Sequence, residues 1–493
     1  MIETFCDYYN LKYNVYDYND LQDLMFLARE KELQLLQRCY TSSRFELLLL
    51  YGRRRTGKTS LLKTFAKDKK SIFFSAQRKN DLLSLQEFSA LIQEFFLGAS
   101  VGSFSDWNAA FSFITTHLGR ERIMLVFDEF PFLAEENPSI FSSLQHRIDH
   151  EWKEKNLFVT LCGSNMGFME EEVIAEKSPL YGRTTYIVEL LPFDYYDSSL
   201  FFPSYSAEHK ILAYGILGGI PRYLEQWDPH LSVRTNLRDS TLRFGSFFGE
   251  ETQAYLRAEL REPTVYNSII EAIASGKNRL NEIATTVGML PTSCSSYVRR
   301  LQSLRLVAQY TPAGSSKNTK KSQYRINDNF FHFWYHFIAP KASYFQLVEA
   351  EVGVNTIMER LPEYMNLVFE DICLQYFIRL ARTNQLPFVP HSLGKWWGTN
   401  PTTKESSDID VLALSDDKKK AIFCECKFRS RTFEVKDFED LVLASSAIGS
   451  VVERYYYVIS KGGFSPAMIQ RAEQEKVTLL SLDDLFCSHV KDV

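Results

Sequence analysis

The chain lacks the features that mark secreted and membrane proteins. Its eight cysteines are scattered without a C-x-x-C pair, so neither a disulfide framework nor a zinc site is indicated, and we expect reduced thiols. No apolar run approaches the length of a membrane span, and the acidic start, MIETFCDYYN, has neither the basic residues nor the apolar middle of a signal peptide. These absences favour a cytoplasmic protein with no membrane partner.

A strong charge of either sign is also missing. The formal net charge of -5 over 493 residues argues against a protein that coats nucleic acid indiscriminately, so any such contact must come from local basic patches. The chain is too long for a single hydrophobic core, and its length suggests about three domains. It contains no internal repeat and no low-complexity tract, and its one loop-like stretch rich in Gly, Ser, Asn and Lys is Pro312–Ser322.

The most informative segment is Phe45–Thr59, FELLLLYGRRRTGKT, an apolar strand that opens into G-x-x-x-x-G-K-T. Its two glycines allow a tight turn whose backbone N–H groups point into a hollow that fits a β-phosphate. We expect Lys58 to reach the β- and γ-phosphates and Thr59 to ligate Mg²⁺ at the start of the helix Ser60–Ala66, whose dipole favours the anion. The pattern predicts an ATP site with the members Gly52, Arg53, Arg54, Arg55, Thr56, Gly57, Lys58, Thr59 and Ser60.

A second strand supplies the acids that hydrolysis requires. Arg122–Glu129, RIMLVFDE, is an unbroken apolar strand that ends in Asp128 and Glu129. In this arrangement the first acid orders the water of the metal and the second activates the attacking water. An acidic pair after a strand is often only a solvated strand end, but this pair follows a P-loop at an ordinary domain spacing. We therefore expect hydrolysis, with Asp128 beside Mg²⁺ and Glu129 as general base.

A third strand, Leu157–Cys162, runs into Gly163-Ser164-Asn165. This places a polar side chain between the other two strand ends, where a γ-phosphate sensor sits. Either Ser164 or Asn165 fits that role, and the same three residues also fit a simple turn.

Six segments then follow one another in the order of a known family. They are LAREKELQLL, LYGRRRTGKTSLL, FDEFPFL, LCGSNMGFM, SPLYGRTTYIVELLPF and GGIPRYLE. From about Leu21 to Glu225 the chain resembles the archaeal-type ATPases of the STAND branch of AAA-type P-loop proteins. The resemblance implies a doubly wound α/β P-loop domain, an Arg183 that meets a γ-phosphate, and a helical lid marked by Gly218-Gly219-Ile220-Pro221. An Arg183 that acts in trans requires a homo-oligomer, whereas the alternative is a surface arginine in a loop.

The segment after Val265 predicts a winged helix. Three stretches, YNSIIEAIASG, LNEIATTVGM and PTSCSSYVRRLQSLRLV, have apolar residues at helical spacing, and AQYTP, a basic loop and SQYRIND follow as a hairpin. Thr292–Leu304 would be the recognition helix, and its contacts would go mostly to DNA phosphates. The residues expected to make these contacts are Ser293, Ser295, Ser296, Arg299 and Arg300 on the helix, and Lys317, Lys320 and Lys321 on the wing. The alternative is a module that only packs within the ATPase.

Near the C-terminus, the helix PEYMNLVFEDICLQYFIRLAR precedes an acidic hairpin, SSDIDVLALSDDKKKAIFCECKF. Glu425 and Lys427 are two apart on one strand and point the same way, so an acid and an ammonium converge beside Asp410. We expect Asp410 and Glu425 to hold Mg²⁺, and Lys427 to position or deprotonate a water and to stabilise charge on a phosphate. Asp408 is an alternative to Asp410, which we favour because it abuts the apolar strand VLAL.

From Leu361 to about Asp484 the chain resembles the PD-(D/E)XK nuclease superfamily. The resemblance implies a restriction-endonuclease-like α/β domain in which Glu370, on the first helix, is a further metal-binding acid. The archaeal-type ATPase family commonly carries such a domain at its C-terminus. The Pro-Asp of the superfamily name appears here as Ile409-Asp410. The alternative is a retained fold whose acids are ordinary strand-end charges.

These patterns predict an N-terminal extension (1–20), a P-loop ATPase domain (21–200), a helical lid (201–260), a winged-helix domain (261–340) and a nuclease-like domain (341–493). One function that fits is an ATP-hydrolysing switch coupled through the winged helix to a Mg²⁺-dependent nuclease, acting on DNA rather than RNA in genome defence or mobile-element biology. The other is a DNA-binding or signalling ATPase whose C-terminal domain is catalytically inactive and recognises a partner.

Overall fold

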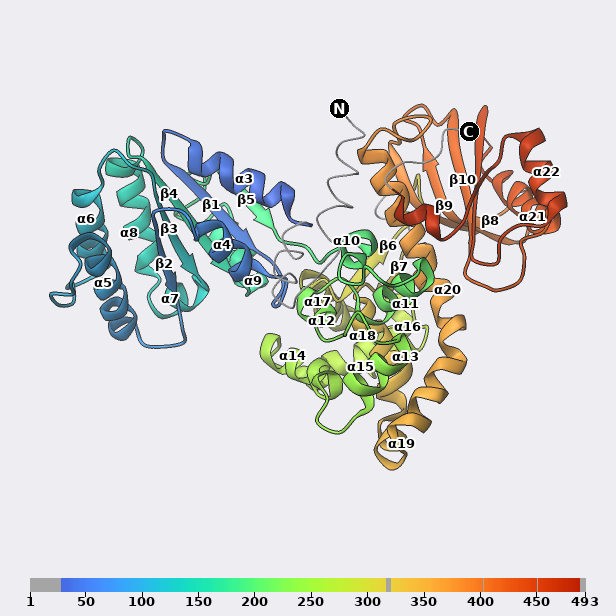
Figure 1. Cartoon of the computed structure of the whole chain (residues 1–493), viewed down its shortest axis with the longest axis horizontal. Helices are drawn as coiled ribbons and strands as arrows, with labels where there is room; N and C mark the ends of the chain where they lie inside the picture. The colour runs from blue at the N-terminus through green and yellow to red at the C-terminus, as the bar shows by residue number, and fades with distance from the viewer. Residues whose placement is uncertain (1–27, 316–320, 402, 450, 488–493) are drawn as a thin grey trace. The chain divides into compact units, whose positions relative to one another are not determined.

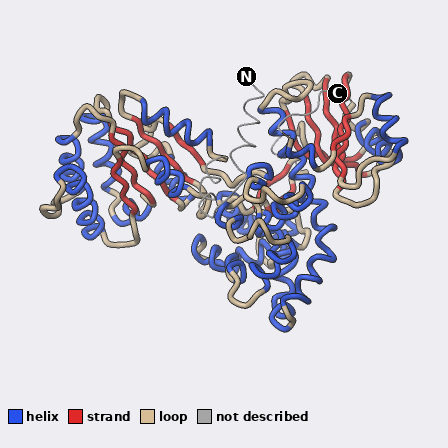
Figure 2. The backbone as a smooth tube through the Cα atoms, viewed as in Figure 1, coloured by secondary structure: helices blue, strands red, loops and turns tan. Residues whose placement is uncertain are grey.

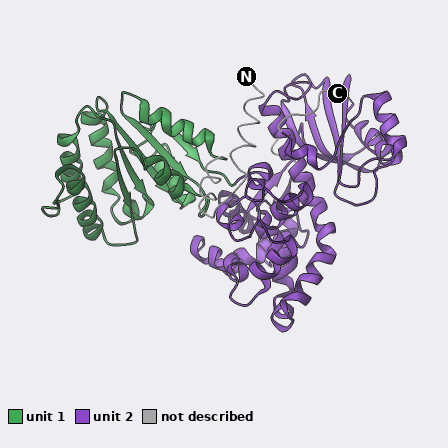
Figure 3. Cartoon of the chain, viewed as in Figure 1, with its two compact units in different colours: residues 1–192 green, residues 193–493 purple. Residues whose placement is uncertain are grey.

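The computed structural model describes residues 28–315, 321–401, 403–449 and 451–487, and the chain divides into two compact units (Figure 3). Unit 1 is Met1–Pro192 and unit 2 is Phe193–Val493. The predicted lid, winged helix and C-terminal domain therefore share one compact unit. The predicted extension, 1–20, and the predicted wing residues Lys317 and Lys320 lie outside the described residues. No helix in the described part of the chain combines the length and the apolar character needed to cross a membrane.

Unit 1 is built on a parallel sheet in the order β2-β3-β4-β1-β5. The strands are β1 (Glu46–Tyr51), β2 (Ser71–Ser75), β3 (Ile123–Asp128), β4 (Leu157–Gly163) and β5 (Tyr186–Glu189). Because β4 lies between the P-loop strand β1 and the acidic strand β3, the carboxyl ends of all three meet at one edge of the sheet. The predicted α/β P-loop fold with a parallel sheet is confirmed.

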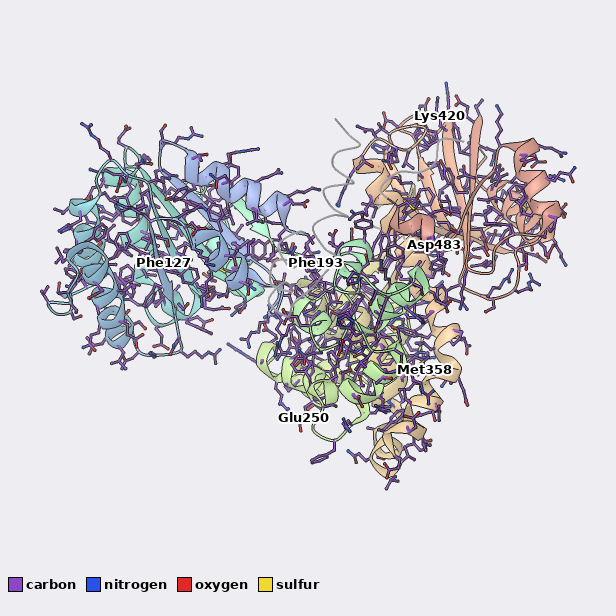
Figure 4. The ribbon with its side chains drawn as sticks, in the orientation of Figure 1. Phe127, Phe193, Glu250, Met358, Lys420 and Asp483 are labelled. Atoms are coloured by element: carbon purple, nitrogen blue, oxygen red, sulfur yellow. The ribbon has the colours of Figure 1, made fainter. Side chains whose placement is uncertain are left out.

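Helices cover both faces of this sheet (Figure 1). Alternate residues of β1 and β3 pack on opposite sides, which is why both strands read as unbroken apolar runs. The helices on the face that includes Phe127, labelled in Figure 4, are α5 (Asp81–Leu97), α6 (Trp107–His117), α7 (Pro131–Glu136) and α8 (Ser139–Arg147). The helices on the other face are α3 (Glu30–Thr41) and α4 (Lys58–Ala66). The shorter elements of unit 1 are η1 (Ile148–Trp152), α9 (Met166–Phe168) and η2 (Met169–Ile174).

Unit 2 begins with short helices and continues into three helices and a hairpin. Helix predominates over strand in this part of the chain (Figure 2). The first group is α10 (Tyr195–Ser199), α11 (Ala207–Leu217), α12 (Pro221–Leu224), α13 (Val233–Leu237), η3 (Arg238–Leu242), η4 (Phe247–Gly249) and α14 (Glu251–Glu259). The second group is α15 (Pro263–Ala274), α16 (Leu280–Thr286), α17 (Pro291–Ser303) and the antiparallel strands β6 (Val307–Tyr310) and β7 (Gln323–Ile326). These elements follow the predicted order, and their assignment as a winged helix stays a prediction.

A long helix, α20 (Ala350–Arg382), connects this part of unit 2 to the C-terminal sheet. Its first half packs on α11, where the Tyr364 hydroxyl donates to Gly215 O at 3.0 Å. A Cβ added at Gly215 would lie 2.5 Å from Met365 Sδ, so a larger residue here would require the flexible Met365 side chain to move. In the last turns of α20, Arg379 Nη1 donates a hydrogen bond to Asp194 Oδ2 at 2.8 Å. The helices that precede α20 are α18 (Asn329–Phe333), η5 (Trp334–Ile338), η6 (Ala339–Lys341) and α19 (Ala342–Leu347).

The C-terminal sheet is mixed, in the order β12-β11-β10-β9-β8. Strands β8 to β10 pair antiparallel, and β10 to β12 pair parallel. The strands are β8 (Ser392–Thr399), β9 (Ser406–Leu414), β10 (Lys420–Lys427), β11 (Glu453–Ser460) and β12 (Thr478–Leu480), and the helices are α21 (Val435–Ser445), α22 (Pro466–Glu475) and η7 (Asp483–Phe486).

The loop of the β6–β7 hairpin lies on β8, the edge strand of this sheet. Ala313 N donates to Lys395 O at 2.8 Å, and Gly314 N donates to Ser392 Oγ at 2.9 Å. The indole N–H of Trp397 donates to the backbone carbonyl of Lys321 at 3.2 Å. The hairpin loop thus pairs with one backbone carbonyl of this edge strand, that of Lys395, and with the side chains of Ser392 and Trp397.

Candidate nucleotide site and a second acidic site

The P-loop has the backbone that its glycines predict. Gly52 and Gly57 have φ values of 151° and 89°. A Cβ added at Gly52 would lie 2.5 Å from Leu190 O, so a larger residue cannot occupy this turn. The helix α4 begins at Lys58, two residues before the predicted Ser60, with Gly57 as its N-cap. Of the remaining predicted loop residues, Arg53 and Thr56 are buried, Arg54 is half-buried, and Arg55 and Ser60 are exposed.

Lys58 and Thr59 are the first two residues of this helix, and their side chains have different partners. Lys58 is buried, and its ammonium donates to the loop carbonyls of Gly52 at 2.8 Å and Arg53 at 3.0 Å. The Thr59 hydroxyl donates to Asp128 Oδ2 at 2.9 Å, so the P-loop and the end of β3 are in direct contact. The structure thus brings the predicted lysine, threonine and first acid to one edge of the sheet.

Asp128 has the character of a cation ligand. It is 4% exposed, and its Oδ1 is buried without a hydrogen-bond partner among the described residues. Burial raises the pKa of Asp128 above its ordinary value, because no buried charge fully compensates the carboxylate. A hydroxyl and a carboxylate are the oxygen ligands that Mg²⁺ uses when it keeps several waters and meets substrate phosphates. Thr59 and Asp128 therefore fit a magnesium ion.

Glu129 is held by the end of β4. Its Oε2 accepts from Ser164 N at 3.1 Å and from the Ser164 hydroxyl at 2.8 Å. Glu129 also has φ 54°, a left-handed conformation that is uncommon for a residue with a side chain. Asn165 has another task, because its Oδ1 accepts from Phe168 N and its Nδ2 donates to Glu135 Oε1, each at 3.2 Å. Of the two sensor candidates, only Ser164 contacts the predicted general base.

Arg183 is engaged within its own unit. Its Nε and Nη2 donate to the Asp149 carboxylate, with Nη2 at 2.6 Å from Oδ2. Its Nη1 donates to Pro179 O at 3.0 Å and to Tyr181 O at 3.1 Å. Arg183 holds the pKa of Asp149 below its usual range through these bonds. The predicted contact of Arg183 with a γ-phosphate stays a prediction.

The second acidic site forms where β9 and β10 separate. The described ladder ends at Cys424 and Val411, and Asp410 Oδ2 then accepts from Cys426 N at 2.8 Å. Glu425 and Lys427 form an ion pair, as their spacing on one strand predicts. Burial, together with Glu425, raises the pKa of Asp410 well above its ordinary value. Burial raises the pKa of Glu425 to about 7, although Lys427 opposes that rise.

Glu370 has a partner that the sequence patterns did not identify. Lys395, on β8, is 5% exposed, and its ammonium lies 3.1 Å from Glu370 Oε2 and 2.7 Å from Asp371 Oδ1. Burial lowers the pKa of Lys395, but Asp371 and Glu370 outweigh that effect and the net pKa is raised. The position of Lys395 in a strand, next to two tryptophans, is the one feature of the sequence that could have indicated a buried lysine here. Glu370, predicted as a metal ligand, is thus neutralised by a lysine in this structure.

No three His, Cys, Asp or Glu side chains in the described part of the chain are grouped so that they could hold a metal ion. At the second site the fit to Mg²⁺ therefore rests on two acids, Asp410 and Glu425, and burial together with the charge of Glu425 raises the pKa of Asp410. Two carboxylates with substrate phosphates are a usual Mg²⁺ set. Asp408, weighed as an alternative, is exposed, and its charge contributes to raising the pKa of Glu425.

Two family models match separate parts of the chain. Residues 26–227 match a model of an ATPase domain found predominantly in archaea, and residues 334–439 match a model built on archaeal and bacterial proteins of unknown function. The uncharacterized protein MJECL04 of Methanocaldococcus jannaschii is 31% identical over 468 residues, which are 93% of this chain and 100% of that protein. The uncharacterized ATP-binding protein MJ0423 of the same organism is 47% identical over 47 residues, 10% of this chain and 80% of that protein.

Two solved structures resemble the chain more distantly. The Walker-type ATPase PABY2304 of Pyrococcus abyssi is 21% identical, with 62% of this chain and 95% of that chain covered at a TM-score of 0.44. The ORC2 protein of Aeropyrum pernix is 13% identical, with 68% and 94% covered at a TM-score of 0.37. Because both scores are below 0.5, we infer nothing further from them.

Proposed function

The chain belongs to the family of ATPases found predominantly in archaea, and on that premise we propose that it is a STAND-type switch that binds Mg²⁺-ATP in unit 1 and hydrolyses it. The observation that carries this proposal is the pair of contacts at one sheet edge, Thr59 to Asp128 and Ser164 to Glu129. They join the P-loop, the metal-binding acid and the general base of one reaction.

Each residue at this edge has a defined task in hydrolysis. Lys58 exchanges its two loop carbonyls for phosphate oxygens, and the N–H groups of the loop and of the first turn of α4 bind the β-phosphate. Glu129 accepts the proton of the attacking water, and Ser164 orients the carboxylate that does so. Thr59 and Asp128 would hold Mg²⁺, which when bound neutralises charge on the phosphates.

The test is the binding and turnover of ATP by Lys58→Ala. Loss of an ammonium that makes several charged hydrogen bonds should weaken ATP binding by about 100-fold or more. Lys63→Ala is the matched control, because Lys63 is an exposed lysine on the same helix. Unchanged ATP affinity and turnover in Lys58→Ala would refute the proposal.

For unit 2 we propose a Mg²⁺-dependent nuclease-like site in which Asp410 and Glu425 bind the metal and Lys427 positions the attacking water. The buried Asp410 and the half-buried Glu425 and Lys427 support this, because charged groups in such surroundings are costly unless they are paired or used in chemistry. The test is DNA cleavage by the full chain with Mg²⁺ or Mn²⁺, with and without ATP. Glu425→Ala with Lys427→Ala should abolish cleavage and leave ATP turnover unchanged.

The control for that pair is Lys420→Ala with Glu453→Ala. These residues also form an ion pair, at 3.1 Å, but their side chains are 40% and 49% exposed, and they lie at the starts of β10 and β11, away from Glu425 and Lys427. If the wild type cleaves neither DNA nor RNA under any of these conditions, the other function holds, in which the C-terminal domain recognises a partner. The Lys395 to Glu370 ion pair is the observation that favours that second function.

For a nucleic-acid partner we propose DNA, contacted by α17. Ser293, Ser296 and Arg299 are exposed on this helix, whereas the hairpin loop that would serve as a wing is bound to β8. Arg299→Ala with Arg300→Ala should weaken DNA binding at all sequences and lower its salt dependence. Binding that is absent or insensitive to salt would favour a packing role for these helices.

We further propose a homo-oligomer in which Arg183 leaves Asp149 and meets the γ-phosphate of a neighbouring subunit. The donor contacts of Arg183 to Asp149, Pro179 and Tyr181 in its own unit would then be features of the resting subunit. Size measurement with and without ATP, repeated on Arg183→Ala, tests this. A chain that stays monomeric at full ATP turnover would contradict it.

A further inference from the structure

A buried arginine that is not among the predicted site residues donates a hydrogen bond to a backbone carbonyl of the P-loop. Arg29 is the N-cap residue of α3 and is 6% exposed. Its Nη2 donates to the carbonyl of Thr56 at 3.3 Å and to the carbonyl of Leu191 at 2.8 Å. Its Nη1 donates to Glu32 Oε1 at 3.4 Å, which fixes the guanidinium on its own helix. Neither loop spacing nor acid spacing in the sequence indicates this role.

The contact with Thr56 bears on the phosphate cradle. The C=O and the following N–H of a planar trans peptide point in opposite directions. With the Thr56 carbonyl turned toward Arg29, the N–H of Gly57 points away from Arg29, to the other side of the loop. Gly57 lies in the turn that the phosphate-binding pattern requires, with φ 89° and Arg55 at φ 70° nearby. The Lys58 ammonium and the Thr56 hydroxyl hold the loop at the carbonyls of Gly52 and Arg53. Arg29 adds a fixed point at the Thr56 carbonyl, between the left-handed residues Arg55 and Gly57.

The contact with Leu191 joins the same loop to the segment that leaves unit 1. Leu190 N donates to Tyr51 O at 2.7 Å, and the backbone of Leu190 leaves no room for a Cβ at Gly52. Leu191 is followed by Pro192, the last residue of unit 1. The P-loop is therefore attached to this connecting segment at its first glycine and, through Arg29, at Thr56.

We propose that Arg29 is a positioning residue that holds the phosphate-binding peptide of Gly57 and transmits its position to the segment 190–192. A nucleotide that pulls the Gly57 N–H toward a phosphate shifts the Thr56 carbonyl, and the fork of Arg29 carries that shift to the Leu191 carbonyl. Arginine suits this task because its planar fork keeps two acceptors in fixed relation, which a lysine ammonium cannot do. The proposal rests on the proposed ATP site in unit 1.

The test compares the full-length wild type with Arg29→Ala, Arg29→Lys and, as a control, Arg38→Ala, an exposed arginine on the same helix. The readouts are the affinity for Mg²⁺-ATP by calorimetry and the hydrogen exchange of residues 186–193 with and without ATP. In the wild type and in Arg38→Ala, ATP should slow the exchange of this segment. Arg29→Ala should bind ATP about tenfold more weakly, because charged hydrogen bonds to the loop are lost, and its segment should not respond.

Removing a buried cation can unfold the chain, so Arg29→Lys is the second variant. This variant keeps the positive charge but lacks the planar guanidinium that bonds two carbonyls at once. We expect it to fold, to bind Mg²⁺-ATP a few-fold more weakly, and to show no effect of ATP on the hydrogen exchange of residues 186–193. A folded Arg29→Ala or Arg29→Lys that matches the wild type in both readouts overturns the proposal. Failure of the proposed function looks different, because then the wild type itself binds no ATP or Lys58→Ala binds it equally well.

Discussion

The two acidic sites of this protein lie at strand ends, but the two sheets gather their side chains in different ways. In unit 1 every strand is parallel, so each carboxyl end delivers its polar residues to the same edge, where Asp128 is buried and Glu129 is half-buried. In the C-terminal sheet an antiparallel pair, β9 and β10, brings Asp410 and Glu425 together, and α20 and β8 add Glu370 and Lys395. The first arrangement leaves its acids available for chemistry, whereas the second neutralises one of them with a buried lysine.

Glu129→Gln should have the largest effect, and it tests whether an acid at the edge of the unit 1 sheet takes part in catalysis. As the general base of the parallel edge, Glu129 should contribute about 10²–10⁴ to ATP turnover, and the amide should leave ATP binding intact. Steady-state phosphate release and calorimetric binding measure the two effects separately. Glu136→Gln, an exposed acid nearby, is the control and should turn over normally. Equal turnover in Glu129→Gln and the wild type would show that another group activates the water.

Lys395→Ala tests whether the buried lysine of the C-terminal sheet stabilises the fold through its ion pairs. It leaves Glu370 and Asp371 without the buried ammonium between them, and breaking a buried ion pair of this kind costs about 3–5 kcal/mol of unfolding free energy. Urea unfolding followed by fluorescence measures the change. Lys420→Ala removes a solvent-screened pair and should lower the free energy of unfolding far less. A small effect of Lys395→Ala would mean that the two acids are not neutralised by it.

The pH dependence of the second site follows from Glu425. Burial raises the pKa of Glu425 to about 7, so its carboxylate is present above pH 7 and is protonated progressively below it. Any Mg²⁺-dependent cleavage should therefore fall as the pH drops from 8 to 6, by about tenfold per pH unit below the pKa. A cleavage rate that is flat over this range would remove Glu425 from the metal-binding step. ATP turnover measured over the same range provides the comparison between the two sites.

Ser164→Ala gives the smallest expected effect and separates the two sensor candidates. The variant removes the 2.8 Å hydroxyl contact with Glu129, and the 3.1 Å backbone contact remains. Loss of one hydrogen bond to a charged group that still keeps another should slow ATP turnover by about 3- to 10-fold. Asn165→Ala should leave turnover near the wild-type value, since Asn165 contacts Glu135 and the start of α9. The reverse result would assign the sensor to Asn165.

Local sequence was sufficient for the parallel edge. Gly52, Gly57 and Lys58 stand at a fixed spacing on one continuous turn, and Asp128 and Glu129 directly follow an apolar strand. In a parallel sheet, such strand ends converge without further information, so the contact of Thr59 with Asp128 could be predicted from pattern alone. The pairing of Glu425 with Lys427 was likewise predictable, because a strand repeats every two residues.

Other contacts depended on the tertiary structure. Arg29 meets Leu191 across 162 positions of sequence, and Lys395 meets Glu370 only because β8 lies against α20. The hairpin loop contacts the edge strand β8, and no pattern in the sequence of the loop indicates this contact. Sequence by itself determined the nucleotide-binding turn, the acids at the strand ends and the apolar strands, because these depend on neighbours within a few residues. The tertiary structure alone decided which buried charges neutralise one another, because that depends on packing between elements that are distant along the chain.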